Sequence, residues 1–168
     1  MGQIAYWKTT KLPEAEAQPE HWVDNEMQVR LPAIAENEQL ARMLVSAFIT
    51  PLNPTLLELA DVKTAVSEAV TNAVIHGYPE PEQKGYIDIL CSCHERRVRI
   101  EIRDQGIGIE DIEQAMVPMY TTKPEMERSG MGFAFMQELM DELQVESKPG
   151  EGVTIVMTKE IGKEEAYE

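Results

Sequence analysis

Two neighbouring segments in which apolar and polar residues alternate constrain the fold of this chain more than any other feature. They are YIDILCSC at residues 86–93 and VRIEIR at residues 98–103. Strict alternation predicts strands with one face in a core and the other in solvent. The short HER sequence between them predicts a β-hairpin. The buried side of the hairpin would carry Ile87, Ile89, Cys91, Cys93, Val98, Ile100 and Ile102.

Two segments with helical periodicity precede this hairpin. Residues 36–49 predict an amphipathic helix, because apolar residues recur there every three or four positions. Its core face would consist of Leu40, Met43, Leu44, Ala47 and Phe48. A longer helix is predicted from Asn53 and Pro54, read as its N-cap and first-turn proline, to a break at Gly77 and Pro79. The buried stripe of this second helix would consist of Val62, Ala65, Val66, Ala69, Val70 and Ala73.

The remaining elements complete a single domain over residues 27–160. MQVRL predicts a strand that Pro32 ends, residues 131–143 predict a helix, and QVES and VTIVMTK predict a final hairpin joined by KPGEG. This order predicts an α/β two-layer sandwich, with a mixed, mostly antiparallel sheet packed on helices. Residues 1–26 hold both tryptophans and show no sustained period, so we interpret them as a flexible extension or a tag. Residues 161–168 are expected to form a C-terminal tail.

Composition narrows the range of partners. The formal net charge of −15 opposes binding to a phosphate backbone. No apolar run reaches the roughly 18–20 residues that a membrane-spanning helix needs, so we expect neither a nucleic-acid partner nor a membrane. The two cysteines lie one residue apart on one predicted strand. That spacing favours buried thiols in a reducing cytoplasm over a disulfide framework or a metal site.

Two glycine motifs indicate where a ligand would approach the backbone. DQGIG at residues 104–108 follows a predicted strand, and RSGMGF at residues 128–133 begins a predicted helix. Free backbone N–H groups at a helix N-terminus favour anions such as phosphates. The polar segment between the motifs is broken by proline and carries Lys123 and Arg128, which indicates a lid with its own cations. Neither the P-loop spacing nor the dinucleotide-binding spacing is present.

The long helix also carries a polar pair, Glu68 and Asn72, four residues apart and therefore on one face. An amide oxygen can serve a hydrated cation, and a carboxylate beside it can accept a proton. An isolated pair of this kind is more often a solvated helix face. His76 is likewise more often a cation that caps a helix C-terminus than a catalyst.

Taken in order, three of these segments resemble a known nucleotide site. EAVTNAVIHG, RDQGIGI and TTKPEMERSGMGF are similar to the N, G1, lid and G2 boxes of the GHKL (Bergerat) ATP-binding superfamily. HGY at residues 76–78, the lid, and N-E-x-x-A-R at residues 37–42 further resemble the anti-sigma-F family of serine kinases from spore-forming Firmicutes. The resemblance covers about residues 27–160, whereas residues 1–26 have no counterpart in it.

The resemblance implies a role for each site residue. Asp104 would accept a hydrogen bond from the exocyclic amine of adenine, which would select ATP over GTP. Gly106 and Gly108 would let the chain pass beside the nucleotide. Asn72 would be the Mg²⁺ ligand, and Glu68 would be the general base that accepts the proton of an incoming serine hydroxyl. The remaining residues implied to bind the nucleotide are Thr121, Thr122, Lys123, Arg128, Ser129, Gly130, Met131 and Gly132.

The implied function is that of an ATP-dependent anti-sigma factor and protein-serine kinase. In that family an ATP-bound homodimer captures a sigma factor and phosphorylates a small anti-anti-sigma protein of the STAS type, and the ADP state favours holding the latter protein. A second face of the first helix, opposite its predicted core face, would provide the docking residues. This face consists of Asn37, Glu38, Ala41, Arg42 and Val45, with Asn37, Glu38 and Arg42 as the contacts.

Two alternative functions are also compatible with the sequence. A nucleotide-gated binding module would share the site but would not require Glu68. The catalytic domain of a sensor histidine kinase would share the fold, but it needs a helical hairpin that bears a phospho-accepting histidine. The 26 residues before Met27 are too few to supply such a hairpin.

Overall fold

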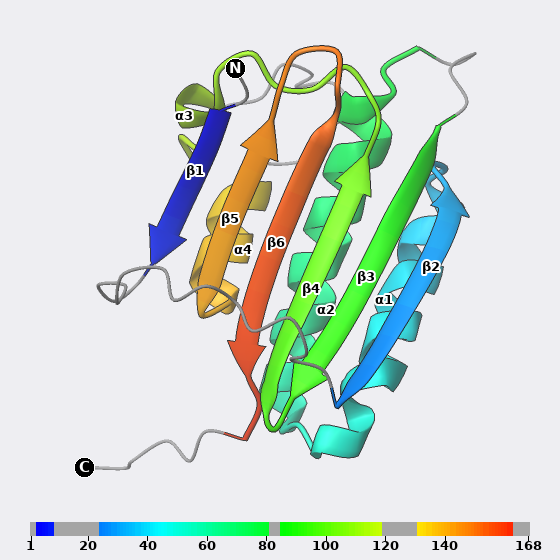
Figure 1. The fold of residues 1–168 in the computed structure, drawn as a ribbon, viewed down its shortest axis with the longest axis vertical. Coiled ribbons are helices and arrows are strands. Elements are labelled where there is room, and N and C mark those ends of the chain that lie inside the picture. Colours follow the sequence, from blue (N-terminus) through cyan, green and yellow to red (C-terminus); the bar gives the residue numbers. More distant parts are fainter. Residues whose placement is uncertain (1–2, 9–23, 81–84, 119–130, 163–168) are drawn as a thin grey trace.

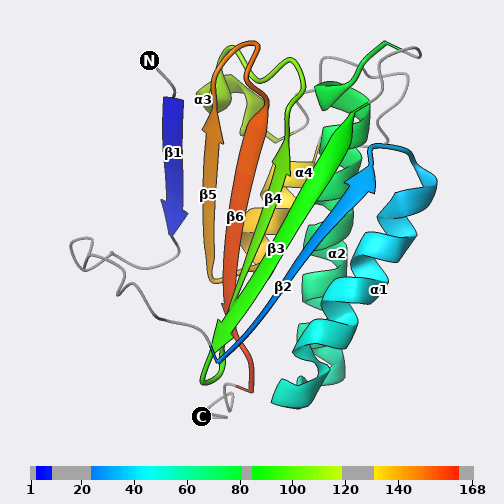
Figure 2. The ribbon, with the colours of Figure 1, turned by 45° about the vertical axis from the view of Figure 1, so that its right-hand side comes forward.

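The computed structural model describes residues 3–8, 24–80, 85–118 and 131–162. These residues form one sheet with helices on one of its faces (Figure 1, Figure 2). The sheet has six strands in the order β1-β5-β6-β4-β3-β2, and every neighbouring pair is antiparallel. The predicted two-layer α/β sandwich is confirmed, with an antiparallel sheet throughout the described part of the chain.

The strands that the alternation predicts are all present. Their bounds, together with those of the unpredicted β1, are β1 Gln3–Lys8, β2 Asn25–Pro32, β3 Tyr86–His94, β4 Arg97–Asp104, β5 Glu142–Ser147 and β6 Val153–Glu160. In the β3–β4 hairpin Ile89 pairs with Ile102 and Cys91 with Ile100, so one face of both strands is apolar, as predicted. The hairpin connection places Glu95 at a φ of 51°.

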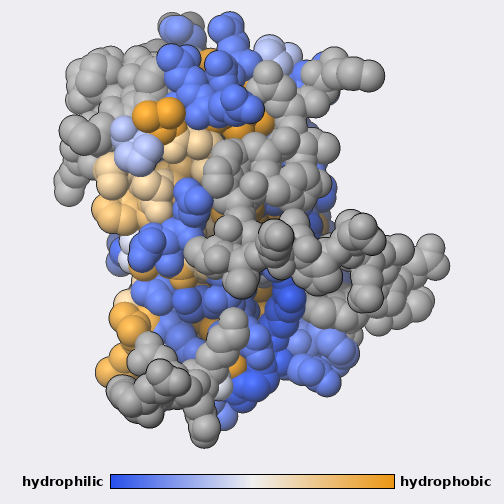
Figure 3. Space-filling view, turned by 90° about the vertical axis from the view of Figure 1, so that its left-hand side faces the viewer, coloured by the Kyte–Doolittle hydropathy of each residue, from blue (hydrophilic) through white to orange (hydrophobic). Residues whose placement is uncertain are grey.

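Strand β1 is the main addition to what the sequence predicts. It pairs with β5 from Gln3 opposite Ser147 to Lys8 opposite Glu142. It therefore forms one edge of the sheet, whereas β2 forms the other (Figure 1). This six-residue segment has no sustained period, and its partner lies more than 130 positions away, so no local pattern predicts the strand. Figure 3 shows this side of the molecule, where the coloured side chains are mostly hydrophilic and the hydrophobic ones form small groups.

The helices pack on one face of the sheet and shield that face from solvent. Their bounds are α1 Glu36–Ile49, α2 Leu56–Asn72, α3 Ile112–Ala115 and α4 Gly132–Leu139, with a 3₁₀ turn at Thr50–Leu52 and a π-helical turn, η2, at Ala73–Gly77. The start of α2 differs from the prediction. Its N-cap is Thr55, whose hydroxyl accepts from the Glu58 N–H in a capping box. Asn53 instead ends the 3₁₀ turn with a left-handed φ of 53°.

The core face of α1 matches the prediction only in part, because Phe48 is buried as predicted but Leu40, Met43 and Ala47 are exposed. Ala41 and Val45 are fully buried, whereas Leu40 is 42% and Met43 is 58% exposed. Both arcs of this helix are apolar, so hydrophobic periodicity alone could not choose between them. The buried residues of α1 are Ala41, Val45, Phe48 and Ile49. The predicted docking face is therefore wrong for Ala41 and Val45.

Helix α4 is shorter than predicted. It ends at Leu139, and the segment from Glu142 belongs to β5 instead of continuing the helix. The Leu139 carbonyl accepts from the Lys159 ammonium at 2.7 Å. Pairing with β6 therefore decides where the helix stops, since Leu143 sits opposite Met157 in the ladder.

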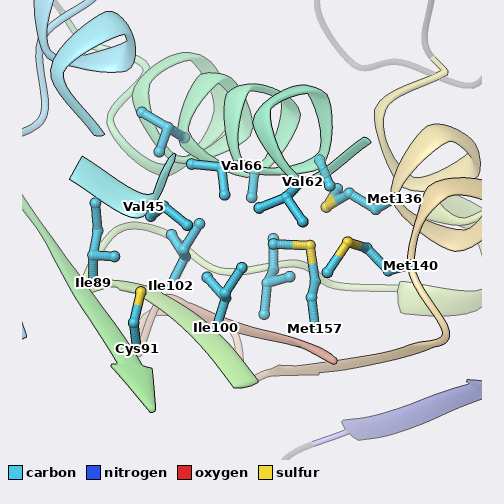
Figure 4. Packing of buried hydrophobic residues seen from close by; sticks show 14 of the residues in the cluster. Val45, Val62, Val66, Ile89, Cys91, Ile100, Ile102, Met136, Met140 and Met157 are labelled. Carbon is cyan, nitrogen blue, oxygen red and sulfur yellow. The ribbon is translucent and has the colours of Figure 1, made fainter. Parts of the chain in front are cut away.

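The core lies between the helices and the sheet (Figure 4). All six residues of the predicted α2 stripe are buried, as are Cys91 and Cys93. Burial raises the pKa of the Cys91 thiol to about 12, so this thiol stays protonated at neutral pH. Ile161 is also fully buried, and its N–H donates to the Arg96 carbonyl at 2.8 Å. The packed domain therefore extends past residue 160.

Candidate nucleotide-binding site

The site begins where the π-helical end of α2 meets the turn that follows β4. The Gly77 carbonyl accepts from the Ile107 N–H at 3.0 Å. A Cβ on Gly106 would lie 2.0 Å from that same carbonyl oxygen. The backbone of the DQGIG motif is thus pressed against the end of α2, and glycine is required at residue 106 for steric reasons. A π-helical turn at this position is typical of functional sites.

Asp104 is held beneath this turn. It is 8% exposed, and its Oδ1 accepts from the Gly106 N–H at 2.9 Å. A Cβ on Gly77 would lie 2.9 Å from Asp104 Oδ1. Burial raises the pKa of Asp104 to about 6, although the N–H groups of Gly106 and Val153 oppose the rise. Asp104 is thus a buried carboxyl group, held by main-chain N–H groups directly beneath the turn.

Glu68 and Asn72 come together with the start of α4. A Cβ on Gly132 would lie 3.1 Å from Glu68 Oε2 and 3.2 Å from Asn72 Oδ1. Two oxygens from α2 therefore converge on the first residue of α4, where backbone N–H groups are free of partners within the helix. This arrangement can bind a phosphate group together with a cation. The helix N-terminus would bind the phosphate, and the carboxylate and amide oxygens would face the cation.

One contributor to the site escaped the sequence analysis. The Ser147 hydroxyl, at the end of β5, accepts from the Ile109 N–H at 2.8 Å and donates to the Gly152 carbonyl at 2.8 Å. Gly108 packs beside it with a φ of 74°, and a Cβ there would lie 2.4 Å from the Lys148 carbonyl oxygen. The β5–β6 connection therefore supports the DQGIG turn from the side away from α2. A serine before a glycine-containing turn carries no signal of this contact.

The other predicted site residues fall into two groups. Thr121, Thr122, Lys123, Arg128, Ser129 and Gly130 lie outside the described residues, whereas Met131 is the N-cap of α4. On α1, the Glu38 carboxylate accepts from the Ser67 hydroxyl at 2.5 Å and lies 3.6 Å from the Arg42 guanidinium. The Asn37 amide donates to the Pro32 carbonyl at 2.8 Å. Glu38 thus contacts α2 with Arg42 beside it, whereas Asn37 contacts the end of β2.

The oxygen atoms near Gly132 suit a Mg²⁺ ion that is shared with a ligand. In the described ranges no group of three or more His, Cys, Asp or Glu side chains is arranged around one point. Mg²⁺ is commonly held by one or two protein oxygens together with substrate phosphates and waters. Asn72, with its oxygen directed at the same point as Glu68, fits a cation that arrives with a nucleotide. Separately, none of the described helices has both the length and the apolar composition for a membrane span.

Substitution of Gly106 by alanine tests the packing of this site. The added methyl group would meet the Gly77 backbone, which cannot move aside as a flexible side chain would. We expect a loss of about 1–3 kcal/mol in the free energy of unfolding, measured by urea denaturation. Gly150→Ala is the control, because nothing lies within 4 Å of its Cβ and only its φ of 81° is unfavourable. Equal losses in both variants would contradict a steric requirement at residue 106.

Comparison with known proteins identifies the family of this chain. Residues 31–159 match the model of the histidine kinase-like ATPase domain. The chain is 49% identical to the anti-sigma F factor of Oceanobacillus iheyensis over 140 residues, which are 83% of this chain and 94% of that protein. It is 50% identical to the anti-sigma F factor of Bacillus subtilis over 143 residues, with 84% and 97% covered.

Two solved structures share the fold. The RsbU and RsbW domains of a Mycobacterium tuberculosis protein give a TM-score of 0.61 at 21% identity, covering 83% of this chain and 33% of that one. The catalytic domain of the histidine kinase ThkA gives a TM-score of 0.51 at 17% identity, covering 80% of this chain and 96% of that one. With relatives at about half identity over nearly their whole length, the chain belongs to the anti-sigma F factor family within the histidine kinase-like ATPases.

Proposed function

We propose that this chain is an ATP-dependent anti-sigma factor that sequesters a sporulation sigma factor of the sigma-F type and phosphorylates the anti-anti-sigma antagonist on serine. The observation that carries the proposal is the convergence of Glu68 and Asn72 on Gly132 at the start of α4. A site that only held nucleotide would need the metal ligand and the helix N-terminus. The carboxylate beside them adds a group that can accept a proton.

Each group has a task in the transfer. Asp104 accepts a hydrogen bond from the adenine amine, and the α4 N-terminus binds the phosphates through its backbone N–H groups. Asn72 holds Mg²⁺, which supplies charge neutralisation on the phosphates. Glu68 takes the proton from the attacking serine hydroxyl of the antagonist. Phosphoryl transfer depends mostly on positioning and charge, so one base and one cation are sufficient.

The charge and the exposed apolar residues of the surface favour binding to other proteins. Net charge of −15 favours fast association with a basic protein such as a sigma factor. Glu38 and Arg42 lie at the α1–α2 edge and present charged groups, while Leu40 and Met43 leave an apolar strip exposed on the outer side of α1. An exposed apolar helix face of this kind favours a homodimer. Glu38 also connects this surface to the helix that carries the proposed base, because it accepts a hydrogen bond from Ser67 of α2.

The test is phosphate transfer from γ-labelled ATP to an anti-anti-sigma protein of the STAS type, together with capture of a sigma factor in the presence of ATP or ADP. We expect label on serine, and sigma capture that is stronger with ATP. A substrate in which the acceptor serine is replaced by alanine is the control. Binding of ATP and sigma factor without any transfer would contradict the kinase part and favour a nucleotide-gated clamp.

A further inference from the structure

Tyr78, the residue that directly follows η2, connects three parts of the structure through its side chain. Its hydroxyl accepts a hydrogen bond from the Gln105 N–H at 2.9 Å and donates one to the Tyr86 carbonyl at 2.9 Å. Gln105 lies between Asp104 and Gly106, and Tyr86 is the first residue of β3. One phenol therefore joins the end of α2, the DQGIG turn and the start of β3.

The ring of Tyr78 has a dedicated place. A Cβ on Gly85 would lie 2.0 Å from the Tyr78 Cζ atom, so the ring rests directly against the glycine backbone. Gly85 in turn accepts at its carbonyl from the Ala33 N–H at 2.9 Å. Only glycine at residue 85 leaves room for the ring, and the ring position is thereby coupled to the segment that leads into α1.

The turn that Tyr78 holds is the one that sets the position of Asp104. Gly77 and Gly106 fix one side of this turn by contact between main-chain atoms, and Ser147 supports it from the other side through Ile109. Between these two supports, the Tyr78 hydroxyl accepts a hydrogen bond from the N–H of Gln105, the residue next to Asp104. A phenylalanine would keep the ring but remove both hydrogen bonds, so the turn would lose this restraint without a cavity being opened.

We infer that Tyr78 is a positioning residue for purine selection: its hydroxyl fixes the Asp104–Gly106 turn so that the carboxylate meets the amine of adenine. This inference rests on the adenine role of Asp104 in the proposed function. Adenine and guanine differ in the group that faces such a carboxylate, an amine against a carbonyl oxygen. A misplaced acceptor therefore weakens ATP more than GTP, since the pairing energy depends on distance and angle.

The experiment measures Mg·ATP and Mg·GTP binding to the full chain by calorimetry. Tyr78→Phe is expected to raise the Kd for ATP by about three- to tenfold, the usual effect of losing one or two partly exposed hydrogen bonds. The ATP-over-GTP preference should fall by a similar factor. The kcat of phosphoryl transfer at saturating ATP should stay within about twofold of wild type, because Glu68 and Asn72 are untouched.

Two further variants separate positioning from general stability. Tyr86→Phe removes a neighbouring tyrosine hydroxyl but keeps the Tyr86 carbonyl that Tyr78 uses, and it should bind both nucleotides as wild type does. Gly85→Ala displaces the Tyr78 ring and should lower the preference at least as much as Tyr78→Phe. Two results would overturn the role of Tyr78 but leave the adenine role of Asp104 intact. One is a lower Tm in Tyr78→Phe with the wild-type preference for ATP over GTP, and the other is the wild-type preference in Gly85→Ala. A wild-type protein without any ATP preference would overturn the adenine role of Asp104 as well.

Discussion

Glu68→Gln is expected to lower the rate of phosphoryl transfer to serine by about 10²–10⁴-fold, the usual contribution of general base catalysis. Glutamine keeps the volume and the hydrogen-bonding reach of the side chain but cannot take a proton near neutral pH. The contact with the start of α4 should survive, since Gly132 leaves the same space. The measurement is single-turnover transfer from labelled ATP to the antagonist protein.

Nucleotide binding distinguishes a lost base from a damaged site. In Glu68→Gln the affinity for ATP should change little, because the proposed metal and phosphate ligands are untouched. Capture of the sigma factor should also change little, because it depends on occupancy of the site by ATP and not on consumption of ATP. Asn72→Ala is the matched variant one turn further along α2. It removes the proposed Mg²⁺ ligand, so nucleotide binding, transfer and sigma capture should fall together. Transfer by Glu68→Gln at nearly the wild-type rate would rule out Glu68 as the base.

Asp104→Asn is expected to weaken ATP binding by roughly 1–3 kcal/mol, the cost of mispairing a buried polar group. The amide can present either its oxygen or its N–H to the purine, so discrimination against GTP should fall as well. Unchanged ATP affinity together with an unchanged ATP-to-GTP ratio would exclude the adenine role. The same variant should have the opposite effect on the stability of the nucleotide-free protein.

The direction of that stability effect follows from the pKa of Asp104, which burial raises from 3.8 to about 6. The folded state favours the protonated acid, so the cost of the buried charge is absent below pH 3.8. It grows between pH 3.8 and 6 and is complete above pH 6. The full cost corresponds to roughly 3 kcal/mol. Asp104→Asn removes this cost. We therefore expect the variant to be more stable than wild type in urea denaturation by a large margin at pH 8 and by a small one at pH 4. An equal difference at both pH values would contradict a titrating Asp104.

These two substitutions also illustrate a division of tasks within the site. Glu68 and Asn72 lie on a regular helix that the core stripe of α2 holds rigidly against the sheet. Asp104 lies at the end of β4, under a turn that depends on close contacts between main-chain atoms. In the proposed role, a hydrogen-bond donor on adenine would stabilise the ionised carboxylate of Asp104 and so offset the free-energy cost of burying its charge.

Much of the fold could be predicted from local patterns. The β3–β4 hairpin, the α2 stripe and the order of strands and helices follow from periodicities of two and 3.6 residues, which depend only on neighbours along the chain. The pairing of Glu68 with Asn72 follows from helix geometry in the same way. The resemblance of the glycine motifs to a known ATP site likewise needed only their order in the sequence.

The rest depended on contacts between distant segments. The sequence could not indicate which apolar arc of α1 faces the core, because both arcs are hydrophobic and only the fit against α2 selects Ala41 and Val45. It could not indicate the short β1, whose partner β5 lies at the other end of the chain. Nor could it show that the side chains of Ser147 and Tyr78 both bond to the main chain of the DQGIG segment and its flank. The chain's own periodicity determined most of the helices and strands, whereas contacts between distant segments decided their ends, the edge strand β1, which surfaces are buried and how the site is held.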